Sequence, residues 1–383
     1  MFLFRKYLFI FLLLFLFLPI IQNRINFINV KSLSGMYKLA DDTVISPAGW
    51  FSGKYQQAKE KYLRDAFGFR NLFIRSRNQL DFSLFGKAHT DDFVIGKNDD
   101  IFWGWYFKTY TGRSFAGTKV LKERMGELKF IQDELAKQNK TLLIVIAPSK
   151  DLFFPEDIPD SIEKADSTDY TVGIKLLQKE GLNYIDFNRY FIEQKNKSPY
   201  PLFYKYDSHW TDYGAFLAGD SIIATIEKIH NLKMAHTDWK DHILKETASG
   251  DELEMEDGLN LIFPFKHDLM GHPKNFAQLD TTLNGPSALF VGDSFFWSLR
   301  DQFNFWDYFK DGDFWYYSWH VYPKGIKPMY DTILMKEELK KNDVFILEVT
   351  EANISKLGFD FPGLAYPIMK SESKPSINSS EKL

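Results

Sequence analysis

Three residue types that cooperate in acyl transfer occur in two short segments of the chain. Asp207 and His209 lie in YDSHW (206–210), and Ser294 lies in LFVGDSF (289–295). A serine hydroxyl is a weak nucleophile until a base takes its proton, and histidine titrates near neutral pH. Residues i and i+2 of an extended segment project to one face, so Asp207 can accept the Nδ1 proton of His209 and leave Nε2 for Ser294. The pattern predicts a seryl acyl-enzyme site.

The setting of Ser294 fits this role. The serine follows the apolar run ALFV and Gly292, and the residues after it can start a helix. The N–H groups of a first helical turn could then hold a developing oxyanion. Two simpler interpretations exist: a plain serine N-cap, and an Asp207–His209 hydrogen bond that only pins a loop. The two segments together favour the catalytic interpretation.

The same aspartate and histidine could instead ligate zinc, with His267–Asp268 or His272 as a further ligand. The chain has no cysteine, which excludes thiolate nucleophiles, cysteine-ligated zinc and disulfides. No second histidine stands at a helical metal spacing beside Asp207. We therefore expect neither a metal nor another cofactor.

Two further residues are candidates for substrate binding. Lys150 follows the apolar run 141–148 and could bind an anionic sugar or support the oxyanion, or it could be a solvated loop lysine. Trp210 could stack on a sugar ring or pack the catalytic loop. Aromatic residues make up 17% of the chain, which fits a carbohydrate-handling protein and an AT-biased genome equally well. A net charge of −4 gives no support for nucleic-acid binding.

The elements that must position these residues alternate between buried apolar strands and amphipathic helices. This alternation predicts an α/β fold, a parallel sheet with helices on both faces, whose reactive groups sit where strands end at the carboxyl edge. The edge rule singles out 147–151, 186–187 and 292–295. Strands are predicted over 141–148, 183–187, 287–294 and 343–350, and helices over 119–138, 172–180 and 212–230.

The N-terminus predicts a membrane segment. Arg5 and Lys6 precede a charge-free run from Tyr7 to Ile21, and no small-x-small cleavage site follows, so we expect an uncleaved signal anchor. The predicted organisation is an anchor (1–27), a connector (28–57), a catalytic domain (58–365) and a disordered tail (366–383). The catalytic domain would include a helical stretch (58–85) and a hairpin (91–103).

YDSHWTDYGA (206–215) and LFVGDSF (289–295), in that order, resemble the alginate O-acetyltransferase family, which has an SGNH-hydrolase-like domain. YLRDAFGFRNLFI (62–74), VIGKNDDIFW (94–103) and IAPSKDLFFPEDIP (146–159) agree with it. Asp99–Asp100 and Ser149 depart from the family pattern. The resemblance implies a flavodoxin-like sheet with the motif order permuted relative to ordinary SGNH hydrolases.

By resemblance, Ser294 is the nucleophile and Asp207 and His209 complete the triad. The implied activity is acetyl transfer to hydroxyls of an exported polysaccharide at the periplasmic face of the inner membrane. An integral membrane O-acyltransferase would supply the acetyl donor. Two alternatives stay open: a carbohydrate acetylesterase with the same triad, and a non-catalytic polysaccharide-binding or assembly protein.

Overall fold

A computed structural model describes most of the 383-residue chain, which divides into two compact units. Unit 1 comprises Met1–Ile95 and Leu253–Phe265, and unit 2 comprises Gly96–Glu252 and Lys266–Leu383. The described residues are 2–35, 38–90, 92–236, 239, 242–246, 253–273, 285–303, 305–325 and 331–373.

Unit 1 is mainly helical. Its first helix, α1, is longer than the charge-free run because it includes the flanking Arg5, Lys6 and Arg24. Within the described residues, Phe4–Ile25 is a candidate membrane span by length and composition, a test that a signal sequence also passes. The unit contains α1 (Phe2–Ile25), α2 (Pro47–Phe51), α3 (Lys54–Asp65), α4 (Arg70–Phe85), β1 (Phe93–Ile95) and α11 (Glu254–Gly258).

The predicted domain boundary at residue 58 is wrong, because α4 packs with a distant segment of unit 1. The guanidinium of Arg75 donates to the carbonyl oxygen of Leu261 at 2.7 Å, and Asn78 Nδ2 donates to that of Leu259 at 3.0 Å. Both side chains are buried, and they donate hydrogen bonds to backbone carbonyl groups of the segment Leu253–Phe265. The expected connector (28–57) also contains α2 and the start of α3, and the expected helical stretch is broken between α3 and α4.

Unit 2 is an α/β domain built on a six-stranded sheet, which confirms the predicted fold class. The strand order is β4-β3-β10-β7-β8-β9; every neighbouring pair is parallel except the antiparallel β8–β9 pair. The central strands are buried on both faces, as their continuous apolar sequences predict. The strands are β3 (Thr141–Ala147), β4 (Tyr184–Asp186), β7 (Ala288–Gly292), β8 (Gly312–Tyr316), β9 (His320–Tyr322) and β10 (Val344–Thr350).

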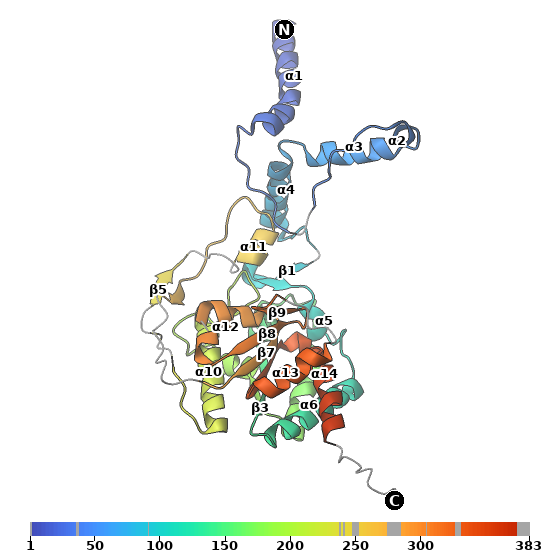
Figure 1. Cartoon of the computed structure of the whole chain (residues 1–383). Helices are drawn as coiled ribbons and strands as arrows, with labels where there is room; N and C mark the ends of the chain where they lie inside the picture. Colours follow the sequence, from blue (N-terminus) through green and yellow to red (C-terminus); the bar gives the residue numbers. More distant parts are fainter. Residues whose placement is uncertain are drawn as a thin grey trace, which may run out of the picture. The chain divides into compact units, whose positions relative to one another are not determined.

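Helices cover both faces of this sheet (Figure 1). One face packs against α6 (Thr118–Ala136), α8 (Asp169–Glu180), α13 (Thr332–Lys341) and α14 (Phe361–Glu372). The other packs against α7 (Lys150–Phe153), α9 (Phe187–Gln194), α10 (Asp212–His230) and α12 (Phe295–Phe303). The rest of the unit includes β2 (Ile101–Trp103), α5 (Tyr106–Tyr110) and the antiparallel pair of β5 (His242–Lys245) and β6 (Met270–Pro273).

Most predicted elements form close to their expected bounds, and α10 has the expected ones. The expected hairpin corresponds to β1 and β2 with a 3-10 turn between them; its first residue, Asp91, lies outside the described residues. The tail predicted from residue 366 is wrong as far as Glu372, because α14 buries Ile368 and Met369 against the sheet. Residues 374–383 lie outside the described residues.

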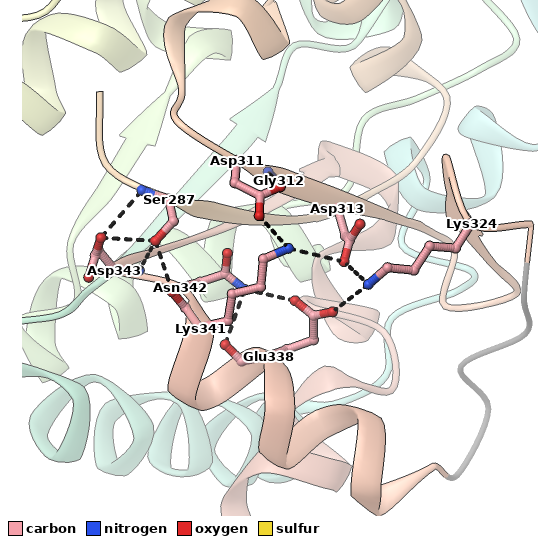
Figure 2. A network of polar contacts seen from close by, with 9 residues as sticks. All are labelled: Ser287, Asp311, Gly312, Asp313, Lys324, Glu338, Lys341, Asn342 and Asp343. Carbon is pink, nitrogen blue, oxygen red and sulfur yellow. Dashed lines mark hydrogen bonds and ion pairs between the residues drawn. The ribbon is translucent and has the colours of Figure 1, made fainter. Parts of the chain in front are cut away.

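The amino edge of the sheet is held by a polar network (Figure 2). Ser287 Oγ donates to Asp343 Oδ2 at 2.9 Å, and so joins the residues that precede β7 and β10. Beside this bond, Asp313 on β8 and Glu338 on α13 are buried carboxyl groups, and Lys324 forms ion pairs with both. This edge is opposite the one at which β7 and β10 end, so the network supports the sheet and not the candidate site.

Candidate active site

Ser294 lies in a tight turn between β7 and α12, as the sequence predicts. Gly292, the last residue of β7, is necessary here because a Cβ atom in its place would lie 2.6 Å from Glu348 Oε2 and 3.2 Å from its Cβ. The turn places Ser294 at the carboxyl edge of the sheet, partly exposed, while Asp293 is fully buried. The edge rule for parallel sheets therefore locates the candidate nucleophile correctly.

His209 and Asp207 lie in a loop that leads into α10. The loop is closed by a bridge between Phe203 and Trp210, and Thr211 caps α10 by accepting a hydrogen bond from the Gly214 amide at 3.1 Å. The loop is not the extended segment that the sequence suggested; residues 205–209 form a turn and a bend. Asp207 Oδ1 instead reaches both the backbone N–H of His209, at 2.9 Å, and its ring.

The three predicted residues form one continuous chain of polar contacts. His209 Nδ1 lies 2.7 Å from Asp207 Oδ1, and His209 Nε2 lies 3.0 Å from Ser294 Oγ. The Asp207 side chain is 1% exposed and the His209 side chain 17% exposed, so the base is reachable while its partner is shielded from water. The His209 ring also packs on Phe295, with centroids 4.9 Å apart. This is the arrangement in which histidine takes a serine proton and a carboxylate orients the imidazole.

Lys150, a candidate for substrate binding, is buried and already paired. The side chain is 2% exposed, and its ammonium group contacts Asp100 Oδ1 at 2.6 Å, the carbonyl oxygen of Ile101 at 2.7 Å and that of Lys205. An ammonium group has three donors, and all three are used here. Lys150 instead ties the loop that carries Asp207 to the residues at the start of β2. The sequence could not show this, because the partner carboxylate lies fifty residues away.

Trp210, the other candidate for substrate binding, is buried as well. Its side chain is 1% exposed and packs edge-on against Phe187 and Phe295, with centroids 6.0 and 5.2 Å away. It forms the core beneath the catalytic loop, which is the alternative that the sequence left open. His272, considered above as a further metal ligand, pairs through Nδ1 with Asp212 Oδ2 at 3.0 Å.

Buried polar groups beneath the serine turn hold it in place, and the sequence did not identify them. The Asp293 amide donates to Glu348 Oε2 at 3.0 Å, and Asp293 Oδ2 accepts from the Thr350 amide at 2.8 Å and Asn353 Nδ2 at 3.1 Å. Burial, and then the adjacent Asp293 carboxylate, raise the pKa of Glu348. Glu348 and Thr350 of β10, together with Asn353 in the segment after it, thereby fix the residue next to Ser294.

A second pair of buried carboxyls, Asp151 and Glu351, lies at the ends of β3 and β10. Both are about 1% exposed. Burial raises the pKa of Asp151 to about 6, and burial together with Asp151 raises that of Glu351 well above its usual value. The segment 147–151, which the edge rule singled out, lies at the same carboxyl edge of the sheet as the serine turn.

The edge rule also singled out residues 186–187. There, Asp186 caps α9 and accepts a hydrogen bond from the Tyr170 hydroxyl at 2.9 Å.

A cavity of about 330 Å³ opens next to the serine turn, and Ser294 itself is not among its lining residues. Two of its lining residues connect it to this turn: the Tyr317 amide donates to the carbonyl oxygen of Gly292, and Asn353 Nδ2 donates to Asp293 Oδ2. The indole of Trp319 is 56% exposed, unlike that of Trp210. The lining combines aromatic rings with two cations and one carboxylate: Arg124, Tyr317, Trp319, Asn353, Lys356, Phe359 and Asp360. The sequence gave no indication of these residues, because they come from α6, the β8–β9 turn and the segment after β10.

Comparison with known proteins identifies the family of the chain. The family described as "SGNH hydrolase-like domain, acetyltransferase AlgX" matches residues 93–312, more than half of the chain and the stretch that holds the Asp207–His209–Ser294 contacts. The chain belongs to this family. The resemblance recognised in the two sequence motifs is therefore confirmed.

The individual proteins that match this chain are distant from it in sequence. The probable alginate O-acetylase AlgJ of Azotobacter vinelandii is 25% identical over 205 residues, which is 52% of this chain and 49% of that protein. The same-named protein of Pseudomonas aeruginosa is 22% identical over 277 residues, 70% of this chain and 66% of that one. The chain thus spans about half the length of the first of these relatives and two thirds of the second.

Two of the solved structures that are similar to this chain are an AlgJ domain and PatB1. The O-acetyltransferase domain of Pseudomonas putida AlgJ is 19% identical with a TM-score of 0.48, covering 73% of this chain and 99% of that one. Bacillus cereus PatB1 is 14% identical with a TM-score of 0.48, covering 71% of this chain and 99% of that one.

Proposed function

We propose that this chain is a serine-dependent O-acetyltransferase that acetylates hydroxyl groups of an exported polysaccharide. The observation that carries the proposal is the contact chain from Asp207 through His209 to Ser294 at the carboxyl edge of the sheet. Family membership supports acetyl transfer as the reaction, and the names of the relatives make alginate the first polymer to test.

The reaction proceeds in two halves. Ser294 Oγ attacks the carbonyl carbon of an acetyl donor while its proton passes to His209 Nε2, and the carbonyl electron pair moves onto oxygen. The oxyanion collapses, the bond to the leaving group breaks, and the leaving oxygen takes the proton from His209. A sugar hydroxyl then repeats these steps on the acetyl-enzyme and leaves as the acetyl ester. Asp207 keeps the imidazole in the required tautomer and stabilises its charged form.

The cavity next to the serine turn is the proposed entry for the acceptor. An exposed Trp319 ring offers a face for a sugar, while Arg124 and Lys356 offer charge. The apolar helix α1 would anchor the chain in the inner membrane with unit 2 in the periplasm. The donor would come from an integral membrane O-acyltransferase. These three assignments belong to the proposal.

A chromogenic acetyl ester tests the proposal and separates it from its rivals. The full-length chain in detergent is mixed with the ester, with and without acceptor oligosaccharides, beside a Ser294→Ala variant. We expect Ser294-dependent release that accelerates with acceptor and yields acetylated sugar. Release that no acceptor accelerates would identify an acetylesterase. Equal release by the Ser294→Ala variant would rule out both enzymatic functions and favour a binding or assembly role.

A further inference from the structure

Attack by Ser294 creates an oxyanion that needs hydrogen-bond donors, and the serine turn itself has few to offer. The amide of Phe295 is already bonded to Asp293 Oδ1 at 3.2 Å, and the amide of Phe296 to the carbonyl oxygen of Asp293 at 3.3 Å. Of these three backbone amides, that of Ser294 remains as a donor for the oxyanion. The expectation that several first-turn amides of α12 hold the oxyanion therefore needs revision, and a second donor must come from another element.

Asn353, which also lines the cavity, is not that donor. A side-chain amide has two N–H groups, and those of Asn353 point to Asp293 Oδ2, at 3.1 Å, and to Thr350 Oγ1, at 3.0 Å. Turning the amide toward a ligand would leave the buried Asp293 carboxylate without one of its partners. Both N–H groups of Asn353 are therefore used to hold the serine turn.

Tyr317 is placed for this task by an unusual backbone. The φ angles of Tyr317 and Ser318 are 50° and 57°, two successive left-handed residues of which neither is glycine. Such conformations cost about 1 kcal/mol or more each and persist where surrounding contacts enforce them. Here the Tyr317 amide donates to the carbonyl oxygen of Gly292 at 2.9 Å, and the buried Ser318 hydroxyl accepts from the Asp360 amide at 3.3 Å.

The side chain of Tyr317 lines the cavity next to the serine turn and is held there. Its ring packs against Tyr316, Trp319 and Phe359 with centroids 4.7, 5.1 and 5.1 Å away. Burial, followed by the nearby Asp293 carboxylate, raises the pKa of Tyr317, so the phenol keeps its proton across the working pH range. A protonated, fixed hydroxyl is a donor that needs no rearrangement when charge develops.

We propose that Tyr317 is a catalytic residue whose hydroxyl donates a hydrogen bond to the acetyl carbonyl oxygen as Ser294 attacks. The Ser294 amide provides the other donor. No bond to Tyr317 forms or breaks, and its proton stays on the phenol throughout. This role rests on the proposed function, because it assigns the oxyanion that forms in both halves of that reaction.

Tyr317→Phe is the test, since it removes one oxygen atom and keeps the ring contacts. Removing one oxyanion donor lowers kcat by about 10²–10³-fold where it has been done, so we expect a loss of that order with KM changed by less than about twofold. The pH dependence set by His209 should not move. Tyr322→Phe, on the neighbouring strand β9, is the matched control and should keep full activity.

A second readout separates donation from mere positioning. An arylboronic acid forms a tetrahedral adduct with a serine nucleophile and so imitates the oxyanion state. We expect Tyr317→Phe to weaken boronate binding to the full-length protein by a factor similar to its loss in kcat. Unchanged kcat, or a fall in kcat with unchanged boronate affinity, would overturn the inference and leave the proposed function intact. Acetyl release or boronate binding that ignores Ser294→Ala would overturn both.

Discussion

At the scale of single residues, the proposed catalytic chain depends on Asp207 being an acceptor for the His209 ring. Asp207→Asn keeps the size of the side chain but presents an N–H group to Nδ1, which favours the wrong tautomer and removes the charge that stabilises imidazolium. We expect the initial rate of acetyl-ester cleavage to fall by about 10³–10⁴-fold.

The chain contains a matched control for this substitution. Asp212 forms a second buried aspartate–histidine pair, with its Oδ2 3.0 Å from His272 Nδ1. Asp212→Asn should cost stability and leave the rate of the folded enzyme within a few-fold of the original. If both variants lose activity equally, Asp207 supports the fold and not the chemistry.

The sequence located the residues that act through local spacing and failed for those that depend on distant contacts. Asp207 and His209 stand two residues apart, and Ser294 follows an apolar strand. Spacing therefore pointed to all three, although the Asp207–His209 loop is turned and not extended as expected. Lys150 follows a strand in the same way, but its burial is decided by Asp100. Tyr317 gave no signal, because nothing in the sequence marks a tyrosine for a left-handed conformation.

At the scale of elements, the serine turn requires β7 and β10 to lie close together. Gly292→Ala would place a Cβ atom 2.6 Å from Glu348 Oε2, and Glu348 is itself bonded to the Asp293 amide. We expect a lower unfolding midpoint and loss of acetyl-ester cleavage, because one of the two strands must move and carry Asp293 with it. Thermal unfolding and activity are measured together.

Gly126 in α6 is a control for Gly292, because there is room for a Cβ atom at its position. A Cβ atom there meets no atom within 4 Å, and alanine in a helix interior is favoured over glycine by about 0.5–1 kcal/mol. Gly126→Ala should therefore raise the unfolding midpoint and keep activity. Equal behaviour of the two variants would contradict the close approach of β10 to the serine turn.

The sequence predicted elements well where the pattern of apolar residues was regular. α10 begins and ends where expected, and β3 and β10 are continuous apolar runs. β8, β9 and α14 were missed. β8 and β9 are short and rich in aromatic residues, and α14 contains Pro367 in a stretch whose polar end resembles a tail. Their burial against the sheet, and not their own sequence, determines them.

At the scale of the whole molecule, buried carboxyl groups make stability depend on pH. Burial, and then the hydrogen bond with Asp313, raise the pKa of Glu338 from 4.5 to about 7, and burial raises that of Asp151 from 3.8 to about 6. A carboxyl whose folded pKa is raised contributes stability that is complete below its unfolded pKa. That contribution is lost as pH rises through the folded pKa.

We therefore expect the free energy of unfolding to fall between about pH 4.5 and 7. For Glu338 the change is roughly 3 kcal/mol, since one pKa unit corresponds to about 1.4 kcal/mol. Urea unfolding at pH 5 and pH 8 measures it. Glu338→Gln, which keeps the contact with Asn342 in Figure 2, should remove part of the pH dependence and leave the part due to Asp151. A variant with the full dependence would contradict the assignment.

The proposed topology is testable because the natural chain has no cysteine. Ser161→Cys introduces a thiol at an exposed position of unit 2, and Arg5→Cys introduces one before the apolar run of α1. In spheroplasts, we expect a membrane-impermeant maleimide to label the first variant and not the second. The opposite pattern would place the catalytic unit on the cytoplasmic side.

The central claim is that Ser294 carries the acetyl group between donor and acceptor. The most direct measurement is mass spectrometry of the full-length protein after brief exposure to an acetyl ester, followed by addition of an alginate oligosaccharide. We predict one acetyl group on the peptide that contains Ser294, and its transfer to the oligosaccharide as an ester. An unmodified Ser294, with the sugar nevertheless acetylated, would contradict the account.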